Sequence, residues 1–229
     1  MSDKRVALVT GGSSGIGLSC AKALKSRGWR VFTLSRRGDG PDGFEHICGD
    51  VSDPAECRRA VETVLKNSRR LDLLVNCAGF GISGAAEFTP EGEAESQVRV
   101  NLFGTANMCK AVIPQMRQQG SGRILNVSSF AALTPIPFQI WYSVSKAGIN
   151  SYTMALANEL RPFGIVAAAI MPGDTRTGFT DVRRKCRRGT KSIAGSFPAA
   201  SQKWKRTSGE AWILPLPGAL SPASRRRSG

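Results

Sequence analysis

Tyr142 and Lys146 lie four residues apart in the segment IWYSVSKAGINSYTMAL, residues 140–156. The apolar pattern of this segment predicts a helix, and residues separated by four positions share one helix face. A tyrosine ordinarily titrates near pH ~10, but a neighbouring ammonium favours the phenolate and lowers that pKa. The pair would then exchange protons near neutral pH. A surface pair without function has the same spacing, so these two residues alone leave both interpretations open.

A glycine-rich segment, TGGSSGIG at residues 10–17, follows an apolar run and precedes a helical pattern. Glycines allow a tight turn and a close approach of the backbone to a pyrophosphate, and the first N–H groups of the helix attract the anion. We therefore predict a dinucleotide site rather than a merely glycine-rich turn. The residues expected to contact the pyrophosphate side are Gly11, Ser13, Ser14, Gly15, Ile16 and Gly17.

The second expected strand ends at Ser35 and is followed by Arg36 and Arg37. A cofactor with a free ribose 2′-hydroxyl usually meets an acidic residue at this point. A guanidinium instead suits a 2′-phosphate. The sequence therefore favours NADP(H) over NAD(H), with Arg36 as the contact; the alternative is a pair of solvated arginines on a loop.

Strands and helices alternate along the chain, and the expected strands are nearly continuous apolar runs, as in a sheet covered on both faces. This order predicts a single α/β domain, Rossmann-like, with a doubly wound and mainly parallel sheet. The expected strands are residues 4–10, 29–35, 45–51, 71–76, 122–129 and 164–172, and the expected helices are residues 18–28, 52–70, 95–119 and 140–162.

Four motifs occur in order: TGGSSGIG at 10–17, NCAG at 76–79, NVSS at 126–129 and YSVSK at 142–146. Together they resemble the short-chain dehydrogenase/reductase family over about residues 4–180. The segments AGFGISGAAE and PIPFQIWYSVSK are most similar to its hydroxysteroid and retinol dehydrogenase members. The resemblance implies an enzyme that interconverts an alcohol and a ketone or aldehyde by hydride transfer with a nicotinamide cofactor.

The resemblance assigns roles to individual residues. Tyr142 would be the acid/base, Lys146 its partner and Ser129 the hydroxyl that orients the substrate, while Asn101 would hold a water of the proton relay. Cys77 departs from the family, which more often has asparagine there, and we expect little effect. The remaining implied cofactor contacts are Asp50, Val51, Asn76, Ala78, Gly79, Pro172, Gly173 and Thr175, besides Tyr142 and Lys146.

The expected substrate is a small, mainly apolar molecule, because Phe80, Phe138 and Gln139 flank the catalytic residues. The helix that carries Tyr142 has small side chains, and in the family this helix often lies in a dimer interface, so we expect a homodimer. The small residues in question are Ala147, Gly148, Ala155 and Ala157.

The N-terminal residues lack the pattern of a signal peptide, and no apolar run is long enough to span a membrane. The six cysteines are scattered without a CxxC pair, which argues against a metal site or a disulfide framework. We therefore expect a cytoplasmic location and reduced thiols.

The net charge of +15 is concentrated near the C-terminus, since residues 186–229 hold nine Lys or Arg and one acid. Sixteen of these residues are Gly, Pro or Ser, and the composition is what a shifted reading frame in a GC-rich gene would give. We expect residues 1–185 to form the oxidoreductase domain and residues 186–229 a disordered or loosely packed tail.

If that interpretation of the tail is correct, the final strand and helix of the fold are missing. The alternative function is then a damaged, non-catalytic protein that still binds NADP(H). A third interpretation treats the basic tail as a nucleic-acid-binding arm, which we consider weaker because no recognised motif accompanies it.

Overall fold

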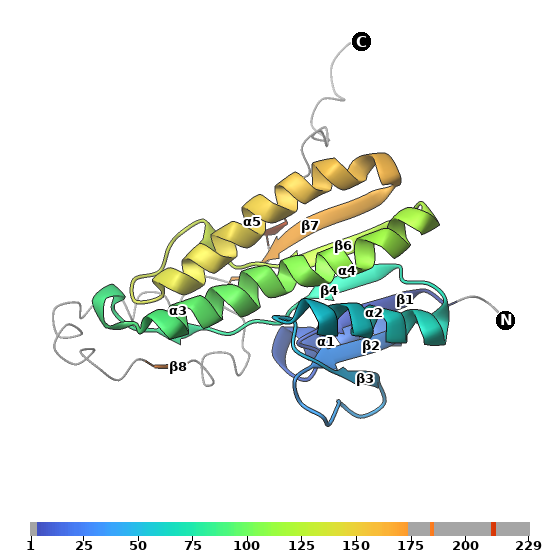
Figure 1. The fold of residues 1–229 in the computed structure, drawn as a ribbon, viewed down its shortest axis with the longest axis horizontal. Helices are drawn as coiled ribbons and strands as arrows, with labels where there is room; N and C mark the ends of the chain where they lie inside the picture. The colour runs from blue at the N-terminus through green and yellow to red at the C-terminus, as the bar shows by residue number, and fades with distance from the viewer. Residues whose placement is uncertain (1–3, 174–183, 186–211, 214–229) are drawn as a thin grey trace, which may run out of the picture.

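The computed structural model describes residues 4–173, 184–185 and 212–213. Its main sheet contains six parallel strands in the spatial order β3-β2-β1-β4-β6-β7, as the alternation of elements predicted (Figure 1). Their bounds are β1 Val6–Thr10, β2 Arg30–Ser35, β3 Glu45–Cys48, β4 Leu73–Asn76, β6 Gly122–Val127 and β7 Ile165–Met171.

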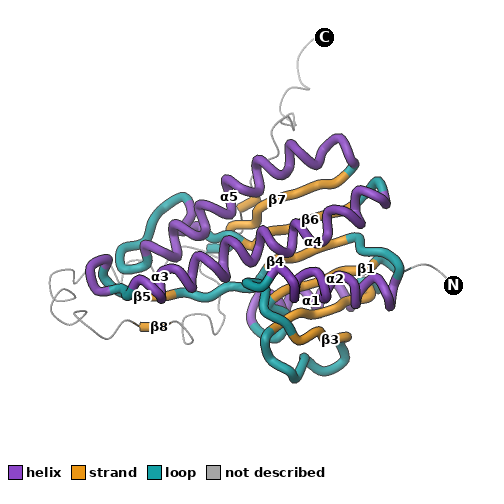
Figure 2. Tube along the Cα trace, in the orientation of Figure 1, coloured by secondary structure: helices purple, strands orange, loops and turns teal. Residues whose placement is uncertain are grey.

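Helices lie on both faces of this sheet (Figure 2). Helices α2, α4 and α5 pack on one face, around Leu8, Leu74 and Ile124. Among the described residues, α1 alone covers the other face, with Ala21 against Val9 and Val75. The helices are α1 Gly15–Ser26, α2 Pro54–Ser68, α3 Glu91–Val98, α4 Gly104–Gln119 and α5 Ile140–Leu160.

Local sequence explains where these helices begin and end. Asp53 caps α2 by accepting hydrogen bonds from the N–H groups of Ala55 (2.7 Å) and Glu56 (3.4 Å), and Pro54 occupies the first helical position. Helix α4 ends at Gly120, which adopts a left-handed conformation with φ +65°. Within the described segments, no helix combines the length and apolarity needed to cross a membrane.

The strand order reverses direction between β1 and β4, since β2 and β3 lie beyond β1, and β6 and β7 lie beyond β4. The carboxyl ends of these two strands therefore border the crevice in which open α/β sheets bind ligands. Thr10 ends β1 and Asn76 ends β4, so two of the sequence motifs meet at this position.

Some boundaries differ from the expectation. The strand expected over residues 45–51 ends at Cys48. The long helix expected over residues 95–119 is interrupted by a π-helical turn, Arg99–Phe103, which joins α3 to α4. The single-turn 3-10 helices are Ala86–Phe88, Phe130–Ala132 and Arg161–Phe163, and a small parallel sheet pairs β5, Ile82–Ser83, with β8, Arg184–Lys185.

Beyond β7, where we expect the final strand of the fold to be missing, the described residues add one short strand. A two-residue strand, β9 (Trp212–Ile213), pairs antiparallel with the end of β7, placing Ile213 opposite Ile170. The other residues of the predicted tail lie outside the described part of the chain.

Candidate active site

The glycine-rich turn between β1 and α1 has no room for side chains at three positions. A Cβ atom at Gly11 would lie 2.9 Å from the backbone nitrogen of Ala78, and one at Gly17 would lie 2.4 Å from the carbonyl oxygen of Gly11. A Cβ atom at Gly12 would lie 2.8 Å from the Cβ atom of Thr33. Gly11 and Gly15 also adopt positive φ angles of 64° and 54°. The turn is therefore shaped for close backbone contact.

The first turn of α1 leaves its N–H groups available to an anion. Ser14 is the N-cap residue, but its side chain makes no capping hydrogen bond, and no acidic residue occurs in the first turn. Ser13, Gly15 and Ile16 are partly exposed beside it. A cofactor pyrophosphate fits this arrangement, because the free N–H groups and the positive end of the helix dipole favour a negative charge.

The loop after β4 is fixed to the glycine-rich turn by one hydroxyl. Thr10 Oγ1 accepts hydrogen bonds from the N–H groups of Cys77 and Ala78, both at 3.1 Å. Asn76 lies below this loop: its side-chain amide donates to Asn126 Oδ1 at 2.9 Å and is almost fully buried. The side chain of Asn76 therefore braces neighbouring strands, while the loop that follows it borders the crevice.

Asn101 occupies the π-helical turn and is fully buried. Its Oδ1 accepts a hydrogen bond from Phe80 N–H, and its amide donates to the carbonyl oxygen of Phe80 and to Ser145 Oγ, all at 3.0–3.1 Å. A Cβ atom at Gly79 would lie 3.0 Å from Asn101 Oδ1 and 3.8 Å from Lys146 Nζ. Gly79 thus marks the point where two of the predicted catalytic residues converge.

Lys146 is 6% exposed, and its Nζ donates a 2.7 Å hydrogen bond to the carbonyl oxygen of Val127. Burial lowers its pKa to about 8. The ammonium lies 5.7 Å from the ring centroid of Tyr142, so the structure brings the two residues of the opening motif together. Lys146 therefore still carries its charge at neutral pH, beside the tyrosine.

Ser129 follows β6 and caps the short helix Phe130–Ala132, with its Oγ accepting a hydrogen bond from Ala131 N–H at 3.1 Å. The hydroxyl proton is then available to another acceptor. The next residue, Phe130, donates to the carbonyl oxygen of Pro172 at 3.1 Å, which places the segment after β7 beside Ser129. Gly173 ends the described segment, and Thr175 lies outside the described residues.

Arg36 and Arg37 are exposed at the end of β2. His46 holds this loop: one ring nitrogen pairs with Thr33 Oγ1 and the other with the carbonyl oxygen of Arg37, both at 2.9 Å. Both ring nitrogens are thus used in positioning the arginine loop, a role that sequence patterns did not indicate.

Asp50 and Val51 form the turn between β3 and α2. Asp50 N–H donates to Glu56 Oε2 at 2.6 Å, and Val51 accepts a 3.0 Å hydrogen bond from Asn107 through its carbonyl oxygen. A Cβ atom at Gly104 would lie 2.6 Å from Val51 Cγ2, so α4 contacts this turn directly. The turn is held rigidly at the same sheet edge as the glycine-rich segment.

The three predicted substrate residues have different surroundings. Phe80 is partly buried, and its backbone is held by Asn101. Phe138 adopts a left-handed backbone with φ 63°, and its carbonyl oxygen accepts a 2.9 Å hydrogen bond from Gly84 N–H. Gln139 is buried, and its Oε1 has no hydrogen-bond partner among the described residues. These contacts bring the segment before Tyr142 against the loop after β5.

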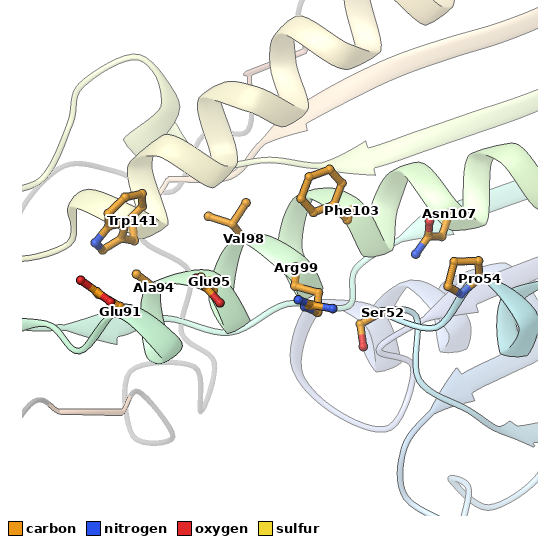
Figure 3. Close-up of a pocket in the computed structure, with 10 residues that line it drawn as sticks. All are labelled: Ser52, Pro54, Glu91, Ala94, Glu95, Val98, Arg99, Phe103, Asn107 and Trp141. Carbon is orange, nitrogen blue, oxygen red and sulfur yellow. The ribbon is translucent and has the colours of Figure 1, made fainter.

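A separate groove of about 720 Å³ opens between α3, α4 and the start of α5 (Figure 3). In the described part of the chain, none of the predicted catalytic, cofactor or substrate residues lines it. Its lining residues are Ser52, Pro54, Glu91, Ala94, Glu95, Val98, Arg99, Phe103, Asn107 and Trp141. The described residues also contain no group of three or more His, Cys, Asp or Glu placed to hold a metal ion.

Sequence reasoning missed several residues that position the site. Besides Thr10 and His46, Ser128 Oγ donates to the carbonyl oxygen of Lys146 at 2.9 Å, and Ser145 links the backbone of Tyr142 to Asn101. Ser128 and Ser145 lie inside two of the sequence motifs, but Lys146 is 18 positions from Ser128 and Asn101 is 44 positions from Ser145, so these contacts depended on the fold.

Comparison with known proteins agrees with this geometry. The short chain dehydrogenase family model matches residues 5–188. The 3-ketodihydrosphingosine reductase of Bacteroides thetaiotaomicron is 42% identical over 180 residues, which are 78% of this chain and 67% of the relative. This chain therefore spans about two thirds of that relative.

Two solved structures show the same architecture. One is a mutant actinorhodin polyketide ketoreductase with NADPH, with TM-score 0.74 and 30% identity, covering 90% of this chain and 79% of the other. The second is an NAD+-bound xylitol dehydrogenase, with TM-score 0.72 and 28% identity, covering 76% and 72%. The fold, the motifs in their places and these matches lead to one conclusion: the chain belongs to the short-chain dehydrogenase/reductase family.

Proposed function

We propose that this protein is an NADP(H)-dependent oxidoreductase that interconverts an alcohol and a ketone or aldehyde, with Asn101, Ser129, Tyr142 and Lys146 as its acid/base system. The observation that carries the proposal is the convergence of Asn101 Oδ1 and Lys146 Nζ on Gly79, with the Tyr142 ring beside the ammonium. This convergence lies at the sheet edge where the glycine-rich turn offers its N–H groups.

When bound, the nicotinamide supplies or accepts the hydride. In the reductive direction, Tyr142 gives its hydroxyl proton to the substrate oxygen, and the Lys146 ammonium stabilises the phenolate that results. Ser129 Oγ donates to the same substrate oxygen, where negative charge develops. Asn101 orients the Phe80 backbone and anchors the water through which Lys146 is resupplied with protons.

The cofactor would lie along the crevice from Arg36 to Pro172. Arg36 offers a bidentate donor to a 2′-phosphate, and no acidic residue ends β2 to repel it. Asp50 and Val51 would border the adenine. The nicotinamide half would be bordered by Ala78, Gly79, Pro172 and Gly173. Since related structures carry NADPH in one case and NAD+ in another, the preference for NADP(H) depends on Arg36.

The names of two relatives indicate a class of substrate to test. One relative is a reductase of 3-ketodihydrosphingosine and another, from Streptomyces violaceoruber, a putative ketoacyl reductase. We propose a ketone on a mainly apolar carbon chain, received between Phe80 and Phe138, with Gln139 as a polar guide.

The decisive test follows NADPH absorbance with 3-ketodihydrosphingosine, β-ketoacyl thioesters and simpler ketones, aldehydes and quinones. Tyr142→Phe should reduce kcat by about a hundredfold or more while NADPH binding stays within about twofold, because only the proton donor is lost. Tyr152→Phe is the matched control, since it removes the other tyrosine hydroxyl of the same helix. An active Tyr142→Phe enzyme would refute the assignment.

The alternative is a non-catalytic protein that binds NADP(H). It is favoured by the sheet edge beyond β7, where the described residues add only the two-residue strand β9. Tight NADPH binding without turnover of any carbonyl compound in the panel would support it.

We further propose that two copies associate through α4 and α5. Phe103 and Trp141 are exposed and line the groove of Figure 3, and Val144 of α5 is exposed as well. The small residues contribute unevenly: Gly148 packs against Leu102 and Ala157 is buried inside the chain, whereas Ala147 and Ala155 are exposed. A cytoplasmic location stays a prediction.

A further inference from the structure

Cys20 and Cys77 form a pair of thiols behind the glycine-rich turn. Cys20 lies on α1 one turn after Gly17, and Cys77 follows β4 directly. A Cβ atom at Gly17 would lie 3.2 Å from the Cβ atom of Cys77, so the face of α1 that carries Gly17 and Cys20 rests on Cys77. The two thiols are hydrogen-bond partners, and both are partly buried and free.

The environment makes one of these thiols reactive. The hydrogen bond from Cys77 lowers the pKa of Cys20 to about 7, and the same bond, together with burial, raises the pKa of Cys77. Burial raises the pKa of Cys57 and of Cys109 to about 12. The contact with Cys77 thus favours the thiolate form of Cys20.

We propose that Cys20 and Cys77 are a redox modification site that a peroxide converts into a disulfide. The Cys20 thiolate attacks one oxygen of hydrogen peroxide, which breaks the O–O bond, gives a sulfenic acid and releases hydroxide. The Cys77 thiol then attacks the Cys20 sulfur and displaces the sulfenic oxygen as water. Two thiols lose two electrons and two protons in total, and the peroxide becomes two molecules of water.

The disulfide would change the glycine-rich turn, because its sulfur atoms lie about 2 Å apart, closer than hydrogen-bonded thiols. Helix α1 and the Cys77 loop have little room to adjust to this bond, because a Cβ atom at Gly17 would lie 2.4 Å from the Gly11 carbonyl oxygen and one at Gly11 would lie 2.9 Å from Ala78 N. The N–H groups of α1 would then shift from the positions that suit a pyrophosphate. This part of the inference rests on the proposed function, and it implies weaker cofactor binding after oxidation.

The first experiment treats the full chain with hydrogen peroxide and maps its peptides by mass spectrometry without reduction. We expect a peptide joining Cys20 to Cys77 with the loss of two hydrogens, reversed by dithiothreitol. Cys48→Ser is the matched control, since it removes the thiol that is exposed among the described residues and should leave the link intact. Cys20→Ser should abolish it. Oxidation that leaves Cys20 and Cys77 unlinked in the wild-type chain would overturn the proposal.

The second experiment measures the Kd of NADPH by fluorescence for reduced and oxidised protein. We expect oxidation to raise the Kd about fivefold or more, the lower range of couplings between sites. By linkage, saturating NADPH should disfavour the disulfide in a glutathione buffer by the same factor. A linked protein with unchanged Kd would refute the effect on the cofactor. If the reduced chain binds no NADPH, the proposed function fails, while the peptide map still decides the disulfide.

Discussion

Lys146 is buried where its function needs it, and this position has a cost in stability. The unfolded chain keeps the proton of this lysine up to its ordinary pKa of 10.5, whereas in the folded chain burial lowers the pKa to about 8. The difference corresponds to about 3 kcal/mol of folding free energy lost at neutral pH. Because the unfolded state holds more protons between the two values, stability should rise as the pH rises from about 8 to about 10.5.

Lys146→Met should remove this pH dependence. We expect the cofactor-free variant to be at least as stable as the wild type at pH ~7 and to lack its rise in unfolding free energy toward pH ~10. Urea unfolding at several pH values measures the effect. Lys110→Met, which removes an exposed lysine of α4, is the control and should keep the wild-type slope. A wild-type stability that falls across this window relative to Lys146→Met would contradict the expectation.

Arg36 gives a second test at the residue scale. Arg36→Asp should raise the Kd of NADPH about ten- to hundredfold and lower that of NADH, because a charge-assisted hydrogen bond to the phosphate contributes about 1.5–3 kcal/mol. Arg37→Asp is the matched control: it makes the same change of charge one residue further along the exposed loop, and it should have a smaller effect. Equal Kd changes for both cofactors would remove Arg36 from the account.

At the scale of elements, the connection between β1 and α1 depends on the absence of side chains. Gly17→Ala would place a Cβ atom 2.4 Å from the Gly11 carbonyl oxygen, a backbone atom that cannot yield cheaply. We expect loss of measurable NADPH binding in a folded protein. Gly92→Ala is the control: it lies in α3 with open space around it, and alanine favours a helix by about 0.5–1 kcal/mol over glycine. Calorimetric titration measures NADPH binding by each variant, and circular dichroism shows whether each variant is folded.

The sequence predicted the parallel strands and the Tyr142–Lys146 contact because both follow from local periodicity. The π-helical turn around Asn101 was not predictable, since the apolar pattern continues through it and the interruption depends on Phe80 and Ser145, which are distant in the chain. Likewise, the ring partners of His46 come from β2 and its loop. Pairs formed by tertiary packing leave little trace in a single sequence.

At the scale of the whole molecule, the proposed dimer makes a distinct prediction. Phe103, which is 58% exposed beside the groove, would become buried between two copies. Phe103→Asp should therefore shift the protein from dimer to monomer in light scattering after size exclusion, because an unpaired buried charge is costly. Ala23→Asp places the same charge on exposed α1, across the sheet, and should leave the mass unchanged. A monomeric wild type would contradict the proposal.

Strand β9 pairs only with Ile170 and Met171, so within the described segments residues 165–169 of β7 have β6 as their single hydrogen-bonded neighbouring strand. Their outward N–H and C=O groups can act as a template for a strand from another molecule. Concentrated or warmed samples should therefore polymerise through added strands instead of unfolding reversibly. Thioflavin fluorescence that grows with protein concentration would reveal such fibres.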